Sequence, residues 1–342
     1  MSSSASSDVR LALIGCGAAA RAYYQPILKK RPELSRNLHC VDREIARAKD
    51  LADSLGSPYF SAHHEDVLDK VQGAIITTPH FLHYPIAMDC LKRKLHVLCE
   101  KPLAATADHA CALVEEAERQ GITLSVNNTW RMFPAFREIH RLLSTGHLGR
   151  LREIRIIEGQ KFDWESYSDF YVNPQVSAKG VLLDVGAHVL DLVCWWAGGR
   201  PELLSCEDDS FGGPESVVSI KATRGDCAIE IHLNRLVDVE SRFRVAGESG
   251  TIQCSANDWN AFGYASRGKK MKTLKVRTQV RTYWELVEEI VESFIDAILA
   301  KGLPLVPARA VLPSMMFLEE CYDRRSRLPM PWLHGLESLI DG

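Results

Sequence analysis

The strongest constraint on the fold is the alternation of apolar runs and amphipathic stretches between Val9 and Val126. The apolar runs have strand length, and they lie at Val9–Ile14, Leu38–Val41, Ala74–Thr77, Leu95–Cys99 and Ile122–Val126. The stretches between them have helical periodicity: the first ends near Arg31, and the others cover Glu44–Leu55, His83–Lys92 and Thr106–Gln120. Strands that alternate with helices of this length predict crossover units, and therefore a doubly wound parallel α/β sheet of the Rossmann type.

After Phe133 the pattern changes to strands that follow one another. A helix is expected at Pro134–Thr145, strands at Leu151–Glu158, Val217–Lys221, Ala228–Leu233 and Phe243–Ala246, and final helices at Tyr283–Ala300 and Arg309–Arg325. Successive strands with turn signals between them predict an open, mainly antiparallel sheet. Because 342 residues exceed the size at which one core stops growing, we expect two domains. The predicted boundaries are 1–127 for the Rossmann domain and 128–342 for a C-terminal α+β domain, whose last helices can pack back on the first.

The composition argues against several classes of protein. A net charge of -3 shows no basic excess for nucleic acid, and no apolar run approaches the roughly 20 residues that span a bilayer. The segment Met1–Ser7 lacks the basic and apolar regions of a secretory signal and is typical of a disordered lead-in. The ten cysteines form no Cys-x-x-Cys pair, which indicates reduced, structural thiols. We therefore expect a cytoplasmic protein.

A glycine turn follows the first predicted strand directly. It reads Gly15-Cys16-Gly17-Ala18-Ala19-Ala20, the Gly-x-Gly-x-x-Gly/Ala pattern with alanine at its third position. The first glycine permits a tight turn, and the second lets the backbone approach a pyrophosphate. The third small residue lets helix and strand pack closely. A plain strand–helix turn is the alternative, but the strand before it and the helix after it favour a dinucleotide site.

Asp42, at the end of the second strand, bears on the choice of cofactor. A carboxylate there can accept both ribose hydroxyls of an adenosine and would repel a 2′-phosphate, which favours NAD over NADP. Arg43 argues the other way, since an arginine can bind a phosphate or stack on adenine. Asp42 could also serve only as a cap for the helix that starts at Glu44.

Two further segments lie just past predicted parallel strands, where open sheets of this kind bind ligands. The first is Thr77-Thr78-Pro79 with His83, and the second is Glu100-Lys101-Pro102. A lysine at that edge can hold a substrate oxygen. The third constellation is Asp184-Val185-Gly186-Ala187-His188, in which the acid and the imidazole share one helix face. It is either a proton-transfer pair or a buried hydrogen-bonded pair of the core.

In this order, the glycine turn, Thr78-Pro79 with His83, Glu100-Lys101-Pro102, Asp184-x-Gly186-x-His188 and Val245-x-Gly247-x-x-Gly250-Thr251 resemble the Gfo/Idh/MocA oxidoreductase family. The resemblance covers nearly the whole chain. It implies an NAD(P)-dependent dehydrogenase or ketoreductase that acts on a secondary hydroxyl of a sugar, a sugar derivative or a cyclitol. It also implies that Lys101 and His188 act on that hydroxyl while Asp184 orients them.

The same resemblance implies a set of binding residues. Those expected to seat the cofactor are Gly15, Gly17, Ala18, Ala19, Asp42, Arg43, Thr77, Thr78, Pro79, His83, Glu100 and Lys101. Besides the catalytic residues, Trp130 and Arg131 are expected near the nicotinamide or the substrate. The chain departs from the family at Ser177-Ala178-Lys179-Gly180, where relatives commonly carry a glycine-rich run. Lys179 could contact an anionic substrate or be a solvated loop residue.

Other readings remain open. The histidines at His63-His64 and His80-x-x-His83 raise the question of a metal. None is expected, because we predict no cluster of acidic or cysteine ligands around them and because His83 is already assigned to the cofactor. A glycosidase that keeps NAD bound and a non-catalytic dinucleotide-binding regulator are the alternative functions. An open sheet with a broad uncovered face predicts a homodimer or homotetramer.

Overall fold

The computed structural model describes residues 9–161, 179–210 and 214–329, and these divide into two compact units. The first unit comprises residues 1–134 and 278–315, and the second comprises residues 135–277 and 316–342. The first unit thus continues past the boundary expected at 127 and includes a segment from the C-terminal part of the chain. The serine-rich start and Ser177-Ala178 lie outside the described residues.

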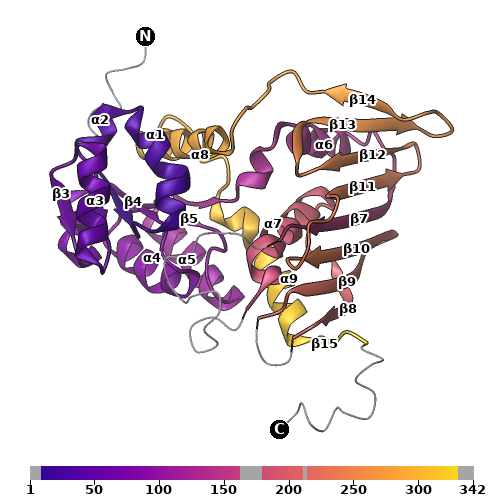
Figure 1. The fold of residues 1–342 in the computed structure, drawn as a ribbon, viewed down its shortest axis with the longest axis horizontal. Helices are drawn as coiled ribbons and strands as arrows, with labels where there is room; N and C mark the ends of the chain where they lie inside the picture. Colours follow the sequence, from indigo (N-terminus) through magenta and orange to yellow (C-terminus); the bar gives the residue numbers. More distant parts are fainter. Residues whose placement is uncertain (1–8, 162–178, 211–213, 330–342) are drawn as a thin grey trace, which may run out of the picture. The chain divides into compact units, whose positions relative to one another are not determined.

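The first unit is built on a six-stranded parallel sheet in the order β3-β2-β1-β4-β5-β6 (Figure 1). Its strands are β1 (Leu11–Ile14), β2 (His39–Val41), β3 (Tyr59–Ser61), β4 (Gly73–Ile76), β5 (His96–Glu100) and β6 (Leu124–Asn127). Every residue of β1 and β4 is buried, as expected of central strands covered on both faces. The arrangement confirms the predicted Rossmann sheet.

Helices cover both faces of this sheet. In Figure 1, α1 (Gln25–Lys29) and α8 (Tyr283–Ile298) lie above it, whereas α4 (His83–Lys92) and α5 (Ala107–Gln120) lie below it. The amphipathic helix α3 (Ile45–Leu55) packs on β2 and β3. Short helical turns complete the unit: η2 (Ala20–Tyr24), α2 (Pro32–Ser35), η3 (His64–Asp66), η4 (Leu68–Lys70), η5 (His80–Leu82), η6 (Thr129–Met132) and η7 (Ala308–Val311).

The first helix ends close to the predicted end near Arg31. Helical structure continues without a gap from residue 18 to residue 29, as η2 followed by α1, and the separate short helix α2 comes after it. Pro32 begins α2, because proline has no backbone N–H and fits the first turn of a helix. The sequence analysis also missed β3, whose three side chains are exposed or half-buried and show no apolar run.

The second unit is built on a nine-stranded sheet in the order β14-β13-β12-β11-β7-β10-β9-β8-β15. Its pairs are antiparallel except for β7 with β10 and β8 with β15, which confirms the predicted, mainly antiparallel sheet. The strands are β7 (Leu151–Gly159), β8 (Glu202–Asp208), β9 (Val217–Arg224), β10 (Cys227–Asn234), β11 (Arg242–Gly247), β12 (Gly250–Ser255), β13 (Asp258–Ser266), β14 (Lys272–Lys275) and β15 (Arg325–Arg327).

The helices of this region are α6 (Pro134–Ser144), α7 (Val181–Trp196) and α9 (Leu312–Asp323). The end of α7 is held by three aromatic rings, since Trp196 meets Phe136 of α6 at a centroid distance of 5.4 Å and Phe136 meets Phe243 of β11 at 5.3 Å. Aromatic contacts of this kind anchor a helix through their large buried area. The C-terminal end of α7 is therefore fixed against the sheet.

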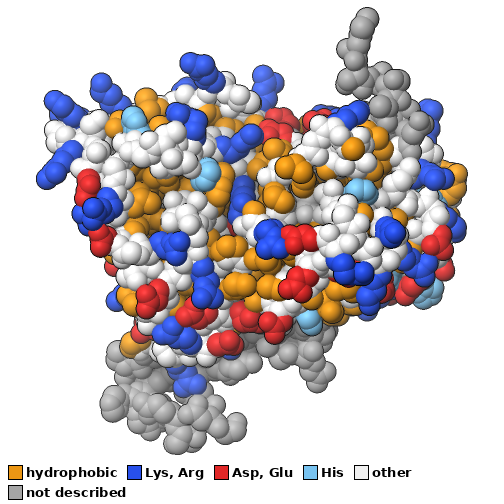
Figure 2. Space-filling view, turned by 180° about the vertical axis from the view of Figure 1, so that it is seen from behind, with side chains coloured by type: hydrophobic (Ala, Val, Ile, Leu, Met, Phe, Trp, Pro, Cys, Tyr) orange, Lys and Arg blue, Asp and Glu red, His pale blue; other side chains and the backbone are white. Residues whose placement is uncertain are grey.

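The surface matches the near-neutral charge of the chain. Figure 2 shows acidic and basic side chains interspersed over the face that it presents. In the part of the chain that the structure describes, no helix combines the length and the apolar character needed to cross a bilayer.

Candidate active site

The glycine turn has the close approach that its sequence predicts. Gly15 adopts a φ of +98°, and a Cβ there would lie 2.8 Å from the Thr77 carbonyl carbon and the Thr78 nitrogen. A side chain is therefore excluded by both the backbone conformation and the contact. At Gly17 a Cβ would meet nothing within 4 Å, so the chain there faces open space. The turn leaves room for a group to approach the backbone at Gly17, as a pyrophosphate requires.

Asp42 holds this turn in place. One carboxylate oxygen accepts the backbone N–H of Cys16 and the other accepts that of Glu44, both at 2.9 Å. Each oxygen can accept further hydrogen bonds, so the carboxylate can still bind ribose hydroxyls. Glu44 rather than Asp42 occupies the N-cap position of α3, where no side-chain cap bond forms. Arg43 is exposed beside it.

Thr77 and Thr78 follow β4 and line the turn. The Thr77 hydroxyl donates to the Gly15 carbonyl at 2.6 Å, which fastens the end of β4 to the glycine turn. The Thr78 hydroxyl is buried and makes no hydrogen bond within the described residues. A buried hydroxyl without a partner is costly, so this atom suits a ligand or a water at the site.

His83 joins the two loops at this edge of the sheet. Its Nδ1 lies 2.8 Å from the carbonyl oxygen of Pro102 and its Nε2 lies 2.8 Å from that of Thr78. The ring is buried, which lowers its pKa, while the two carbonyls favour the protonated form. The structure shows His83 bridging two backbone carbonyls, those of Thr78 and Pro102. Its expected contact with a cofactor remains a prediction.

Glu100 sits in a buried polar network before Lys101. Its Oε1 accepts from the Tyr24 hydroxyl at 2.9 Å and from the Asn127 amide at 2.7 Å, and its Oε2 accepts from the Lys101 backbone at 3.3 Å. Burial raises the pKa of Glu100, and these hydrogen bonds oppose that shift. The network fixes the backbone that carries Lys101, and the sequence offered no sign of Tyr24 or Asn127 as its members.

Trp130 and Arg131 are held inside the first unit. Trp130 stacks on Phe133 at a centroid distance of 5.8 Å, and Arg131 donates to the Ala310 carbonyl at 2.8 Å. Both side chains are buried. Their expected role near the nicotinamide or substrate remains a prediction, and the structure gives them packing and hydrogen-bonding roles.

In the second unit, α7 carries Asp184 and His188. His188 is buried and Asp184 is half-buried, and the Asp184 carboxylate accepts a charged hydrogen bond from Arg235 at 2.8 Å. Between them a Cβ at Gly186 would come within 3.0 Å of Leu182 and of Leu233 on β10, so glycine lets the helix lie close to the sheet. Arg235 was not predicted as a site residue. It follows β10 directly, and the sequence around it contains no motif that indicates a contact with Asp184.

Lys179 lies against an aromatic ring of α9. It is half-buried, and its Nζ lies 4.6 Å from the centre of the Tyr322 ring, a cation–π contact. Burial lowers the pKa of this lysine. A solvated loop residue is therefore the wrong description, and contact with an anionic substrate remains a prediction.

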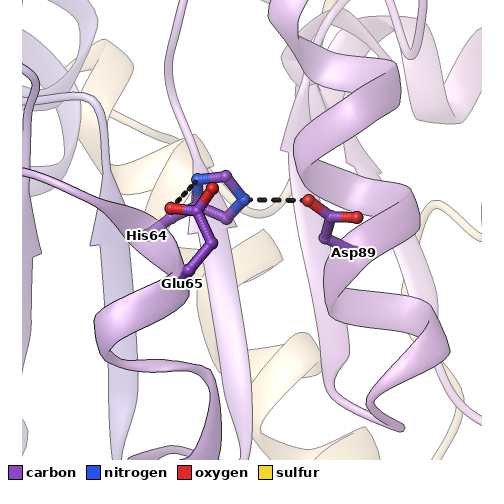
Figure 3. Close-up of side chains that lie close together, drawn as sticks. All are labelled: His64, Glu65 and Asp89. Atoms are coloured by element: carbon purple, nitrogen blue, oxygen red, sulfur yellow. Dashed lines mark hydrogen bonds and ion pairs between the residues drawn. The ribbon is translucent and has the colours of Figure 1, made fainter.

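A histidine with two carboxylates lies elsewhere in the first unit. The His64 ring lies between Glu65, at 3.3 Å from its Nδ1, and Asp89 on α4, at 3.2 Å from its Nε2 (Figure 3). The expectation that no acidic groups cluster near these histidines is thus wrong, because Glu65 follows His64 directly in the sequence and Asp89 is brought in from a distant helix. Both ring nitrogens already face carboxylates, which fits a polar contact between η3 and α4. Among the residues the structure describes, this is the group whose atoms lie close enough together for a metal.

Comparison with known proteins agrees with this architecture. Residues 9–128 match the model of the oxidoreductase family with an NAD-binding Rossmann fold, and residues 136–253 match that of the GFO/IDH/MocA C-terminal domain. The first unit is thus an NAD(P)-binding Rossmann domain, which places the chain among the two-domain oxidoreductases of this type. The chain belongs to the Gfo/Idh/MocA family.

Individual relatives are more distant. A glucose-6-phosphate 3-dehydrogenase of Bacillus subtilis is 26% identical over 195 residues, which are 55% of this chain and 53% of that protein. The match therefore spans about half the length of that relative. A myo-inositol dehydrogenase of Streptomyces leeuwenhoekii is 25% identical over 311 residues, 87% of this chain and 90% of that one. The structure of an oxidoreductase domain protein from Kribbella flavida superposes with a TM-score of 0.82 at 21% identity, covering 92% of this chain and 96% of that one.

Proposed function

We propose that this protein is an NAD(P)-dependent dehydrogenase or ketoreductase that transfers hydride between the cofactor and a secondary hydroxyl of a sugar, a sugar derivative or a cyclitol. The observation that carries the proposal is α7 of the second unit, which holds a half-buried carboxylate at Asp184 and a buried imidazole at His188 in a chain whose Rossmann unit bears Lys101. The relatives named as dehydrogenases of glucose 6-phosphate and of myo-inositol support this substrate class.

The residues of the first unit fit a dinucleotide. Open space at Gly17, the unsatisfied hydroxyl of Thr78 and the carboxylate of Asp42 offer, in turn, room for a pyrophosphate, a hydrogen-bonding group and an acceptor for ribose hydroxyls. We favour NAD over NADP, because the Asp42 carboxylate would repel a 2′-phosphate. When bound, the nicotinamide ring accepts or donates the hydride.

The protein's own groups supply the proton transfer and the electrostatics. In the oxidation direction His188 removes the proton from the substrate hydroxyl, since imidazole titrates near neutral pH. Lys101 donates a hydrogen bond to the same oxygen and stabilises the negative charge that develops on it. Asp184, which accepts a hydrogen bond from Arg235, orients these two groups. Glu100 and His83 fix the loops that present Lys101.

Two other functions make different predictions. A glycosidase with tightly bound NAD would consume glycosides without net formation of NADH, and a dinucleotide-binding regulator would turn over nothing. The presence of Lys101, Asp184 and His188 together argues against a regulator, which need not retain this catalytic set.

The test is NADH or NADPH formation by the purified protein across inositols, aldoses, uronates, sugar phosphates and nucleotide sugars. Lys101→Met and His188→Ala should each lower turnover at least about a hundredfold, while Lys92→Met, which changes an exposed lysine of the same unit, should not. Activity that survives both active-site changes would refute the mechanism. Cleavage of glycosides without net reduced cofactor would establish the glycosidase instead.

We also propose a cytoplasmic homodimer or homotetramer. All ten cysteines are free thiols, which suits a reducing compartment. The outward side chains of the second sheet include ion-paired Arg155 and Glu230, and a second copy of the chain is the partner we expect on this face. Light scattering that gives the mass of a monomer would refute the oligomer.

A further inference from the structure

The N-terminal end of α7 is held by one residue from a different part of the chain. Glu215 is fully buried and meets three successive backbone N–H groups. Its carboxylate oxygens accept those of Gly180 and Leu182, each at 2.9 Å, and its backbone carbonyl accepts that of Val181, also at 2.9 Å. The first N–H groups of a helix have no partner within the helix, and a negative charge there is favoured by the helix dipole. Glu215 supplies the acceptors. Burial raises the pKa of its carboxyl group, and the hydrogen bonds from Tyr322, Leu182 and Gly180 oppose that shift.

Position 180 has no room for a side chain, so only glycine fits there. A Cβ at Gly180 would lie 1.8 Å from the Glu215 carbonyl oxygen and 2.6 Å from its nitrogen. Gly180 is also the N-cap residue of α7 and makes no side-chain cap bond of its own. The helix therefore depends on Glu215 for a cap.

The carboxylate is itself held from the C-terminal segment. The Tyr322 hydroxyl of α9 donates to the Glu215 carboxylate at 2.9 Å, and Arg325 of β15 lies 3.9 Å from it. Arg325 also bonds Asp208 at 3.1 Å. The buried carboxylate is thus held by the N–H groups at the start of α7 and also by side chains of α9 and β15.

The cap is connected directly to the reactive face of the helix. The first hydrogen bond of α7 runs from the Asp184 N–H to the Gly180 carbonyl at 3.2 Å. Because Trp196 anchors the far end, a displacement at Gly180 would tilt the first turns, where Asp184 and His188 lie. Misplacement of about 1 Å can lower a rate a hundredfold.

We infer that Glu215 is a positioning residue of the active site, which fixes the first turn of α7 and thereby the directions of Asp184 and His188. The inference rests on the proposed function as far as turnover is concerned. Nothing in it concerns the cofactor, because Glu215 and α7 belong to the second unit, whereas the glycine turn belongs to the first.

The decisive variant is Glu215→Gln. The amide has nearly the shape of the carboxylate but replaces one oxygen with an NH₂ donor, which then faces the Gly180 or Leu182 N–H. Tyr322→Phe removes only the phenol donor and is the milder second variant. Glu202→Gln, at an exposed position on β8, is the matched control. Amide hydrogen exchange over residues 180–186, kcat, KM and the Kd for NADH are measured for all of them, together with the melting temperature.

We expect Glu215→Gln to increase exchange at 180–186 and to lower kcat by about tenfold to a hundredfold, with the Kd for NADH within about twofold of wild type. Tyr322→Phe should also increase exchange at 180–186 and lower kcat, but by less. Glu202→Gln should leave the exchange and kcat unchanged. Unchanged exchange at 180–186 would overturn the inference. Increased exchange or a lower melting temperature with an unchanged kcat would overturn the positioning role and leave a structural one. If the wild type turns over no substrate, the proposed function fails, and the exchange result alone decides whether Glu215 holds α7.

Discussion

Replacing Gly15 with alanine tests two requirements of the glycine turn at this position: a positive φ and space for the Thr77–Thr78 backbone. Gly56 and Gly17 serve as controls that distinguish these requirements. Gly15 has a φ of +98°, and a Cβ there would lie 2.8–2.9 Å from the Thr77–Thr78 backbone. Gly56, at the end of α3, has a φ of +70° but nothing within 4 Å of a Cβ. Gly17 lacks a positive φ and has the same open space. All three belong to the first unit.

The magnitudes follow from these differences. Gly56→Ala should lower the free energy of unfolding by about 1–2 kcal/mol, because alanine must adopt the left-handed backbone conformation there. Gly15→Ala should lower it by that amount and by about a further 1–3 kcal/mol, because the Thr77–Thr78 backbone just after β4 must move to admit the methyl group. Gly17→Ala should change stability by less than about 0.5 kcal/mol. It should nevertheless weaken NADH binding, because its methyl group occupies the space where a pyrophosphate meets the backbone.

The assay combines thermal unfolding with NADH fluorescence titration. For a unit of this size, each kcal/mol lowers the melting temperature by about 2–4 °C. We expect Gly15→Ala to lose both stability and affinity, Gly56→Ala to lose stability alone, and Gly17→Ala to lose affinity alone. Equal melting temperatures for Gly15→Ala and Gly56→Ala would refute the close contact with Thr77, and wild-type affinity in Gly17→Ala would refute the cofactor site.

Three further outcomes can be measured. Asp42→Ala should shift the ratio of NAD to NADP affinity toward NADP by about tenfold, and an unchanged ratio would refute the preference for NAD. Arg235→Met should destabilise the second unit by about 1–3 kcal/mol; adding Asp184→Asn should recover part of this loss, so strictly additive effects would show that the pair does not interact. Burial raises the pKa of Glu158, so the folded state binds this proton more tightly than the unfolded state. The stability of the wild type should therefore fall as the pH rises from the unfolded pKa, about 4.3, through the folded pKa, and Glu158→Gln should lessen that fall in urea titrations at several pH values.

The local features of the dinucleotide site could be predicted from the sequence. Gly15, Gly17 and Asp42 lie in one strand–turn–helix–strand segment, where the glycine spacing together with the flanking strand and helix predicts a phosphate turn and a carboxylate after the next strand. The alternation of buried strands and amphipathic helices likewise predicts the parallel sheet, because each element shows its own periodicity. The separate short helix α2 after the first helix was not predicted, although Pro32 at its start was visible.

The partners of the candidate catalytic residues could not be predicted. Arg235 reaches Asp184 across 51 positions of sequence, and Glu215 reaches Gly180 across 35. Neither residue belongs to a recurring pattern, and the ion pair and the cap exist only because β10 and the segment before β9 fold beside α7. The contacts of His83 and Lys179 are of the same kind, since their neighbours come from another loop and from α9.

By itself, the sequence determined the Rossmann sheet, the second sheet, the family and the residue types that can hold a cofactor and move a proton, because these depend on periodicity and on short motifs. The tertiary structure decided how those groups are held: which carboxylate caps α7, which arginine pairs with Asp184, and which backbone atoms His83 joins. Such contacts depend on how distant segments pack, and the packing free energy is shared among many residues, so no local pattern records them.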